Sequence, residues 1–194
     1  MVWFVIDGMD GSGKTTSSDY IRKELESRGR KVLEITHPNH DRFFGRVAAK
    51  FLTIDNKMSV IFATVFYILD VVCSLFKMKI KSRDYDDVIF VRYILAVAYL
   101  PESLCPLGYK LFSRIFPMPD VKVFVDVDSK TAMERILERG EELEIYETEE
   151  KLDKTRRKMQ SITEGWIVVD NSSTREYTEK QTAQILSSLE GMIW

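Results

Sequence analysis

The amino-acid sequence predicts an α/β fold of three layers, in which helices cover both faces of a five-stranded parallel sheet. Three observations favour this fold: short apolar runs, helical patterns between the runs, and a glycine-rich turn directly after the first run. The apolar runs, which are typical of strands buried on both faces, lie at residues 2–7, 31–36, 88–91, 121–127 and 166–170. Strands that alternate with helices in this way indicate a doubly wound sheet.

The stretches between the apolar runs carry helix signals. Residues 20–29, 129–140 and 175–191 each show a helical pattern that stops at a glycine. No internal repeat, low-complexity stretch or linker separates these elements. Residues 1–194 are therefore predicted to form a single domain.

Composition excludes several classes of protein. Hydrophobic residues make up 45% of the chain and charged residues 30%, which is typical of a folded domain and not of a disordered chain. The net charge of −2 gives no basic field, so no nucleic-acid partner is expected. Cys73 and Cys105 form no paired motif, and His37 and His40 have no cluster of metal ligands beside them in the sequence. Neither a disulfide nor a metal site is predicted from these four residues.

One stretch, residues 58–76, is about long enough and apolar enough to cross a bilayer. Asp70 lies within it, where a buried charge is costly, so a membrane span is disfavoured. A helix packed between neighbours, at a subunit interface, fits the pattern better, and a homodimer is expected. The first residues lack the basic lead-in and apolar core of a signal peptide, so a cytoplasmic location is expected.

The most specific motif is GMDGSGKTT at residues 8–16, between the first predicted strand and a helix. Gly8, Gly13, Lys14 and Thr15 satisfy the pattern G-x-x-x-x-G-K-[ST] of a phosphate-binding P-loop. The glycines let successive backbone N–H groups turn toward phosphate oxygens, and the start of the helix adds its positive end. Lys14 is placed to reach the β- and γ-phosphates, and the Thr15 hydroxyl to bind Mg²⁺. The motif predicts the binding of a nucleoside triphosphate.

Other P-loop classes fit the rest of the chain poorly. The guanine-reading motif N-K-x-D would need an aspartate at Ser59 and a later place in the chain, and the DVDS stretch at residues 126–129 lacks the glycine of D-x-x-G. A GTPase is therefore disfavoured. A motor or transporter ATPase would be larger and would carry further coupling motifs.

Several stretches together resemble the thymidylate kinase family of P-loop nucleoside monophosphate kinases. FVIDGMDGSGKTT (4–16) is similar to the opening of that family, with Asp7 at the position of its glutamate. MPDVKVFVDVDSKTAMERILERGEE (118–142) resembles a later strand and helix that carry Arg135 and Arg139. VRYILAVAY (91–99) resembles D-R-Y-x-x-S-x-x-A-Y, and WIVVDNSSTREYTEK (166–180) resembles the strand and loop near adenine.

The resemblance implies a reaction and a set of site residues. The family moves the γ-phosphoryl group of ATP to the 5′-phosphate of a nucleoside monophosphate, with dTMP as the default acceptor and Mg²⁺ as cofactor. Catalytic roles are implied for Lys14, Arg92 and Arg139. ATP is expected to contact Gly8, Asp10, Gly11, Ser12, Gly13, Lys14, Thr15, Thr16, Arg135 and Arg139. The acceptor is expected at Asp10, Arg46, Phe66, Arg92 and Tyr99, and the metal at Thr15 and Asp7. The acceptor-binding region is expected at about residues 37–80 and a lid at about residues 139–152.

Three departures from the family pattern fall outside the P-loop. Val91 stands where the family carries an aspartate that helps to organise Mg²⁺, and a valine cannot bind metal. Asp70 aligns with a family arginine, and a carboxylate there would repel a phosphate. The lid stretch at residues 140–152 is acidic, and within it Glu147 aligns with the lid glutamate of the family. Two alternatives stay open: a kinase with a different acceptor, and a non-catalytic nucleotide-binding regulatory protein.

Overall fold

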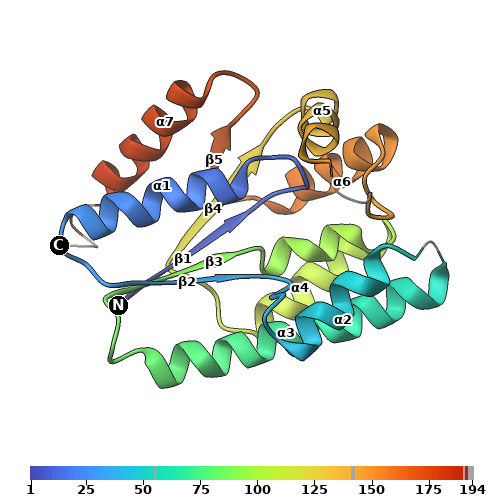
Figure 1. The fold of residues 1–194 in the computed structure, drawn as a ribbon, viewed down its shortest axis with the longest axis horizontal. Coiled ribbons are helices and arrows are strands. Elements are labelled where there is room, and N and C mark those ends of the chain that lie inside the picture. The colour runs from blue at the N-terminus through green and yellow to red at the C-terminus, as the bar shows by residue number, and fades with distance from the viewer. Residues whose placement is uncertain (55, 141–142, 190, 192–194) are drawn as a thin grey trace.

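Five parallel strands form one sheet in the order β2-β3-β1-β4-β5 (Figure 1). The strands are β1 (Val2–Asp7), β2 (Val32–Thr36), β3 (Asp87–Val91), β4 (Val121–Asp126) and β5 (Ile167–Asp170). The computed structural model describes residues 1–54, 56–140, 143–189 and 191. Each strand begins and ends within one residue of the apolar run that predicts it, so the five-stranded parallel sheet is confirmed.

The helices lie in layers on the two faces of the sheet (Figure 1). One face is covered by α1 (Lys14–Ser27) and α7 (Arg175–Ser188), and the other by α3 (Lys57–Lys81), α4 (Cys105–Ile115) and α6 (Glu149–Ile162). A 3-10 helix, η1 (Ile94–Tyr99), packs with this second layer, α2 (Phe43–Leu52) packs on α3, and α5 (Ser129–Arg139) packs on α6. The three-layer architecture is therefore confirmed.

The central strands are apolar throughout because each of them serves two cores. Side chains alternate across a strand, so neighbouring residues point to opposite faces of the sheet. On β1, Phe4 and Ile6 join the core beneath α1 and α7, whereas Trp3 and Val5 join the core on the other face. All six residues of β1 are buried, which explains why the sequence shows a continuous apolar run in place of an alternating one.

The order of the strands determines where a ligand can bind. β1 pairs with β3 on one side and with β4 on the other, so the connections leave β1 in opposite directions. A crevice opens beyond the carboxyl ends of parallel strands at such a point. The predicted P-loop follows β1, and the segment from Arg92 to Tyr99 follows β3, so the two lie side by side at this edge.

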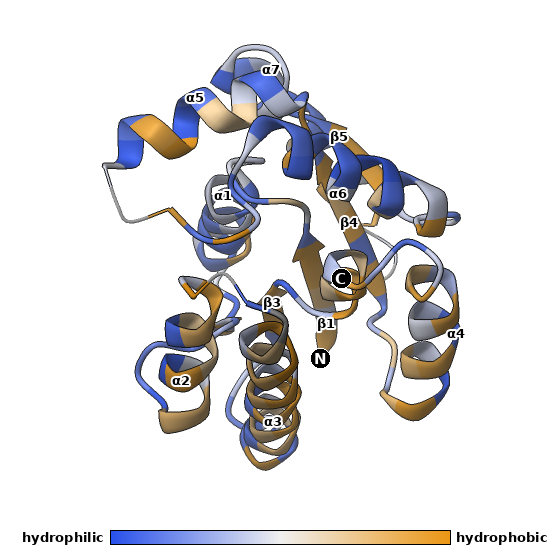
Figure 2. Ribbon diagram, turned by 90° about the vertical axis from the view of Figure 1, so that its right-hand side faces the viewer, coloured by the Kyte–Doolittle hydropathy of each residue, from blue (hydrophilic) through white to orange (hydrophobic). Residues whose placement is uncertain are grey.

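α3 is longer than the predicted apolar stretch and is buried on one side only. Large apolar side chains along its outer side are exposed, and the helix is hydrophobic along most of its length (Figure 2). Within the described ranges, α3 between Met58 and Lys81 is the one helix long and apolar enough to cross a membrane by length and composition. Only 28% of its most apolar window is buried within one chain, so the expectation that neighbours at a subunit interface cover this helix stays a prediction.

Candidate active site

The loop between β1 and α1 has the geometry of a phosphate cradle. Gly13, which precedes α1, has a φ of 84°, a conformation that favours glycine. A Cβ atom at Gly8 would lie 2.5 Å from the carbonyl oxygen of Val125, so only glycine fits there. No side chain caps the start of α1, which leaves its first backbone N–H groups free to bind an anion. Thr15 and Thr16 in this first turn are exposed.

Two side chains from other elements hold the P-loop from outside. The Asn171 side-chain amide donates to the Ser12 carbonyl at 2.7 Å, and the Arg135 guanidinium donates to the Asn171 carbonyl at 3.0 Å and to the Gly11 carbonyl at 3.5 Å. Arg135, Asn171 and Gly13 also line a shallow, partly open cavity beside α1 and α7. Asn171 follows β5, and the resemblance of residues 166–180 to an adenine-binding strand and loop is the signal that points to it.

Lys14 is buried at the centre of the P-loop. Its Nζ donates to the Met9 carbonyl at 2.9 Å and lies 3.6 Å from an Asp10 carboxylate oxygen. Burial lowers the pKa of Lys14 to about 8, an effect that the Arg139 charge adds to and the Asp7 charge opposes. The positive charge of this buried ammonium is only partly balanced by nearby carboxylates, so a phosphate bound beside it would be stabilised.

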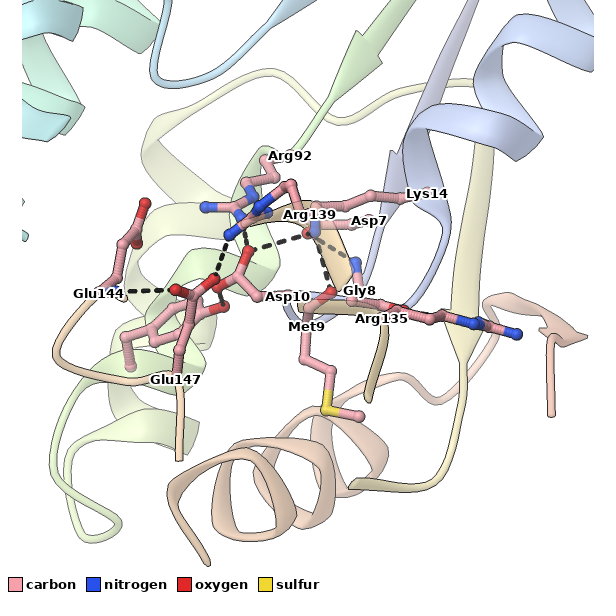
Figure 3. A network of polar contacts seen from close by, with 12 residues as sticks. Asp7, Gly8, Met9, Asp10, Lys14, Arg92, Arg135, Arg139, Glu144 and Glu147 are labelled. Atoms are coloured by element: carbon pink, nitrogen blue, oxygen red, sulfur yellow. Dashed lines mark hydrogen bonds and ion pairs between the residues drawn. The ribbon is translucent and has the colours of Figure 1, made fainter. Parts of the chain in front are cut away.

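Asp10 connects the P-loop to the segment after β3 (Figure 3). Its carboxylate forms an ion pair with the Arg92 guanidinium and accepts a hydrogen bond from the Tyr99 hydroxyl at 2.7 Å. The side chain of Asp10 is 2% exposed, so these contacts replace water around the carboxylate. Three residues predicted for the acceptor, Asp10, Arg92 and Tyr99, are thus brought together.

A cavity that is partly open to solvent lies beside this group. Arg92 and Tyr99 form part of its wall. α3 supplies another part through a stripe of residues with helical spacing, Val60, Ala63, Thr64, Tyr67 and Val71. Phe112 of α4 and Phe116, which directly follows α4, close a further side. The wall is mostly apolar, which suits a planar organic ring better than a charged group.

The segment before α6 covers the cavity from the lid side. Arg139 forms a 2.8 Å ion pair with Glu147, and Glu147 also accepts from the Glu144 backbone N–H at 2.7 Å (Figure 3). The Glu144 side chain lines the cavity, and burial raises the pKa of its carboxyl. At least one acidic side chain of the predicted lid, Glu147, is therefore neutralised by an ion pair with Arg139.

Two residues predicted for the acceptor lie elsewhere. Phe66 stacks on Phe51 of α2 with ring centroids 6.2 Å apart and planes 12° apart, so it serves the packing of α2 on α3. Helical geometry explains the difference, because Tyr67, one residue on, is turned by a quarter of a circle and faces the cavity. Arg46 is exposed on α2 and donates to the Asp41 carbonyl at 3.3 Å. Neither side chain forms part of the cavity wall.

Asp7, which the sequence predicts as a metal ligand, instead fixes the backbone of the site. One carboxylate oxygen accepts from the Gly8 N–H at 2.9 Å, and the other from the N–H groups of Tyr93 at 2.9 Å and Leu95 at 3.0 Å. Burial raises the pKa of the Asp7 carboxyl, while these bonds act in the opposite direction. Across the described ranges, no group of three or more His, Cys, Asp or Glu side chains could hold a metal ion.

The two substitutions that the sequence singles out have different structural roles. Val91 is fully buried in the core beneath α1 and α7. Asp70 is also buried, but its carboxylate accepts from the Asn39 N–H at 2.7 Å and lies 3.8 Å from Arg42, outside the cavity wall. The Asp70 carboxylate therefore anchors the loop before α2, and its repulsion of an acceptor phosphate stays a prediction.

This chain is similar in sequence and in fold to proteins of one family. The family model described as thymidylate kinase matches residues 6–182. A probable thymidylate kinase of Archaeoglobus fulgidus is 25% identical over 197 residues, which cover 94% of this chain and 93% of the relative. A thymidylate kinase of Akkermansia muciniphila is 27% identical over 190 residues, which cover 94% and 90% of the two chains. The solved structure of thymidylate kinase from Candida albicans is similar in fold, with a TM-score of 0.70 at 18% identity over 98% of this chain and 91% of that chain.

Proposed function

The chain belongs to the thymidylate kinase family, and from this membership we propose that it transfers the γ-phosphoryl group of ATP to dTMP, yielding dTDP and ADP. One observation carries the proposal: Asp10 of the P-loop pairs with Arg92, which lines the neighbouring cavity. Phosphates held by the loop and a phosphate held by Arg92 would lie next to each other. Direct transfer between two bound anions requires that proximity.

On the donor side, the backbone N–H groups of the loop and of the first turn of α1 bind the phosphate oxygens. Lys14 supplies a positive charge at the β- and γ-phosphates, and Arg139 supplies a second from the lid. Phosphoryl transfer asks little covalent chemistry of a protein, so positioning and neutralisation of charge are sufficient. The cavity between Thr16, Arg135 and Asn171 is the proposed site for the base of ATP.

On the acceptor side, Arg92 exchanges the Asp10 carboxylate for the 5′-phosphate of the acceptor. A guanidinium suits this role because its planar fork matches two phosphate oxygens. Asp10, still bonded to Tyr99, then accepts a hydrogen bond from the sugar, and Tyr67 forms an aromatic wall for the base.

Mg²⁺ fits this site through a single protein ligand. The exposed Thr15 hydroxyl at the start of α1 is the oxygen available to it, whereas Asp7 is engaged by three backbone N–H groups. Such a ligand set suits a cation that retains several waters and binds mainly through substrate phosphates. When bound, Mg²⁺ would neutralise charge on those phosphates.

Two further properties belong to the proposal. The exposed apolar side of α3 supports a homodimer, because a surface of this kind on a single chain invites association. A second subunit packed on α3 would explain the apolar surface of this helix without a membrane. We therefore propose that the enzyme acts in the cytoplasm. Small nucleotides are its proposed ligands.

A coupled ADP-release assay with a panel of nucleoside monophosphates, with and without Mg²⁺, tests the reaction. Acceptor-dependent ADP production with dTMP is expected, and Lys14→Ala should abolish it. Lys23→Ala, on the exposed side of the same helix, is the matched control and should retain it. Turnover only with another monophosphate would support a different acceptor, and nucleotide binding without turnover would support a regulatory protein.

A further inference from the structure

Arg92 has an unusual backbone conformation. Its φ is 65°, and among the described residues it is the only one other than glycine with a positive φ. This left-handed region is sparsely populated by residues with a side chain, so it persists only where the surroundings hold it. The conformation turns the chain between β3 and η1 and thereby sets the direction in which the Arg92 side chain leaves the sheet.

His37 contacts this turn at two points. Its backbone N–H donates to the Val91 carbonyl at 2.9 Å, as a continuation of the β2–β3 pairing. Its ring Nδ1 lies 2.8 Å from the Arg92 carbonyl oxygen. On the other side of the turn, the Arg92 N–H donates to the Ile6 carbonyl at 3.0 Å. Both polar groups of the Arg92 backbone are therefore paired, and the His37 ring supplies one of the two partners.

The protonation of the ring follows from its partners. A carbonyl oxygen can only accept, so Nδ1 carries a hydrogen and donates to Arg92. Nε2 lies 2.7 Å from the Ser74 hydroxyl, whose single hydrogen is shared between Nε2 and the Asp70 backbone carbonyl at 3.1 Å. Burial lowers the pKa of His37 to about 4, and the neighbouring Arg42 charge also disfavours the charged ring. The neutral ring thus has a defined donor and a defined acceptor.

Ser74 connects His37 to α3 and to the loop before α2. Its hydroxyl accepts from the Arg42 guanidinium at 2.8 Å, and Arg42 lies beside the buried carboxylate of Asp70. Asp70 in turn accepts from the Asn39 N–H at 2.7 Å. The chain of contacts therefore runs from Arg92 through His37 and Ser74 to α3 and to the loop before α2, which both border the cavity.

We propose that His37 is a positioning residue that fixes the Arg92 backbone through its Nδ1–H bond, so that the guanidinium points between the P-loop and the acceptor phosphate. This inference rests on the proposed function, because Arg92 is assigned to the acceptor there. The alternative is a histidine that only packs, since its ring also contacts Phe90 with centroids 5.1 Å apart. If His37 only packs, a ring without nitrogen can replace the imidazole; if its Nδ1–H bond positions Arg92, such a ring cannot.

Three variants separate the explanations. His37→Phe keeps a ring and removes both hydrogen bonds. His37→Asn places an amide nitrogen near the position of Nδ1 and keeps the bond to Arg92, whereas His37→Gln places its amide near Nε2 and keeps the contact with Ser74. We expect kcat/KM for dTMP to fall about tenfold to a hundredfold in the Phe and Gln variants, because small misplacements of a positioning group have effects of this size. His37→Asn should recover most of the loss, and KM for ATP should stay unchanged in all three.

An arm that does not depend on turnover completes the test. Hydrogen exchange of the Tyr93 and Leu95 amides, which bond to Asp7 next to the turn, should be faster in the Phe and Gln variants than in the Asn variant and wild type. Equal exchange and equal kcat/KM in wild type and His37→Phe would overturn the proposal. So would equal losses in all three variants with KM for ATP raised as well, because that indicates packing alone.

If His37→Phe does not fold, the comparison of kcat/KM between His37→Asn and His37→Gln tests the proposal. A wild type that phosphorylates no acceptor contradicts the proposed function, while hydrogen exchange still decides whether His37 holds the turn.

Discussion

Lys14 is buried, and burial favours loss of its proton. Its Nζ contacts the Met9 carbonyl at 2.9 Å and lies 3.6 Å from the Asp10 carboxylate, which is shared with Arg92. The pKa of about 8 therefore lies below the ordinary value of 10.5. A bound triphosphate adds several negative charges close to Nζ and favours the charged form again. Binding of ATP and protonation of Lys14 are consequently linked.

We expect the affinity for ATP to weaken as the pH rises above about 8. The free protein loses the Lys14 proton there, and binding must then take up a proton, so the dissociation constant should rise by up to about tenfold per pH unit. Calorimetry in two buffers with different ionisation enthalpies measures this uptake directly. Lys14→Ala should bind ATP weakly at every pH, and Lys23→Ala should keep the wild-type dependence. Affinity that does not change between pH 7 and pH 9.5 would contradict the assignment.

Val91→Asp is expected to destabilise the protein without restoring activity. Val91 is fully buried among apolar side chains, so an aspartate there loses its hydration without a partner. The free energy of unfolding should fall by roughly 3 kcal/mol, measured by urea denaturation, and turnover of dTMP should gain little. Val91→Thr has nearly the shape of valine and is the control. A large gain in turnover with Val91→Asp would show that the family carboxylate can still act at this position.

At the scale of single residues, the sequence predicts local chemistry better than long-range contacts. The P-loop residues lie where the motif places them, because a turn between a strand and a helix is determined locally. The pairing of Asp10 with Arg92 joins segments more than eighty positions apart, and it depends on β1 lying next to β3. His37 gives no local signal at all, since its partners are a backbone carbonyl and a serine on another element.

At the scale of the helix, the two sides of α3 have different neighbours. The side that carries Ala63, Tyr67 and Val71 faces the cavity, and the next face carries Phe66, which contacts α2. An apolar helix with several neighbours does not reveal from its sequence which stripe faces which neighbour. This explains why the sequence predicts Phe66 for the acceptor, whereas the neighbouring Tyr67 lines the cavity.

Exchanging these two aromatic residues for alanine should separate their roles. Tyr67→Ala removes part of the cavity wall and should raise KM for dTMP by about tenfold, since an aromatic surface beside a base contributes ~1–3 kcal/mol. Phe66→Ala should leave KM for dTMP unchanged and lower stability, because its ring packs on Phe51. Steady-state kinetics and thermal unfolding of both variants provide the measurement. A raised KM for dTMP in Phe66→Ala, with no change in Tyr67→Ala, would instead indicate that the base contacts Phe66.

At the scale of the molecule, the parallel sheet is the best-predicted feature. Strands that are buried on both faces form near-continuous apolar runs, and β1 and β3 are buried at every residue, whereas the edge strands β2 and β5 are partly exposed. The order of the strands, by contrast, is not encoded in any one run. It follows from how the connecting helices pack on the two faces, and it is the order that brings the P-loop, Arg92 and the cavity together.

The outer side of α3 predicts the oligomeric state. This helix of 25 residues is about 37 Å long, and Ile61, Val65, Leu69 and Phe76 leave between 38% and 63% of their surface exposed. A stable interface buries about 800 Å² on each partner, and a helix of this length can supply much of that area. Packing against a second copy removes the apolar surface from water, which is the main favourable term in association.

We therefore expect light scattering to report a dimer of two 22.6 kDa chains at micromolar concentration. Val65→Glu together with Leu69→Glu should yield monomers, because two carboxylates at the centre of the stripe would be desolvated and would repel their counterparts in the second copy. Ser187→Glu, which adds a charge at an exposed position of α7 on the other face of the sheet, should leave the dimer intact. A wild-type monomer that remains soluble would contradict the interface. Binding of that monomer to lipid vesicles, lost in the Val65 and Leu69 variant, would assign the apolar side of α3 to a membrane surface in place of a second subunit.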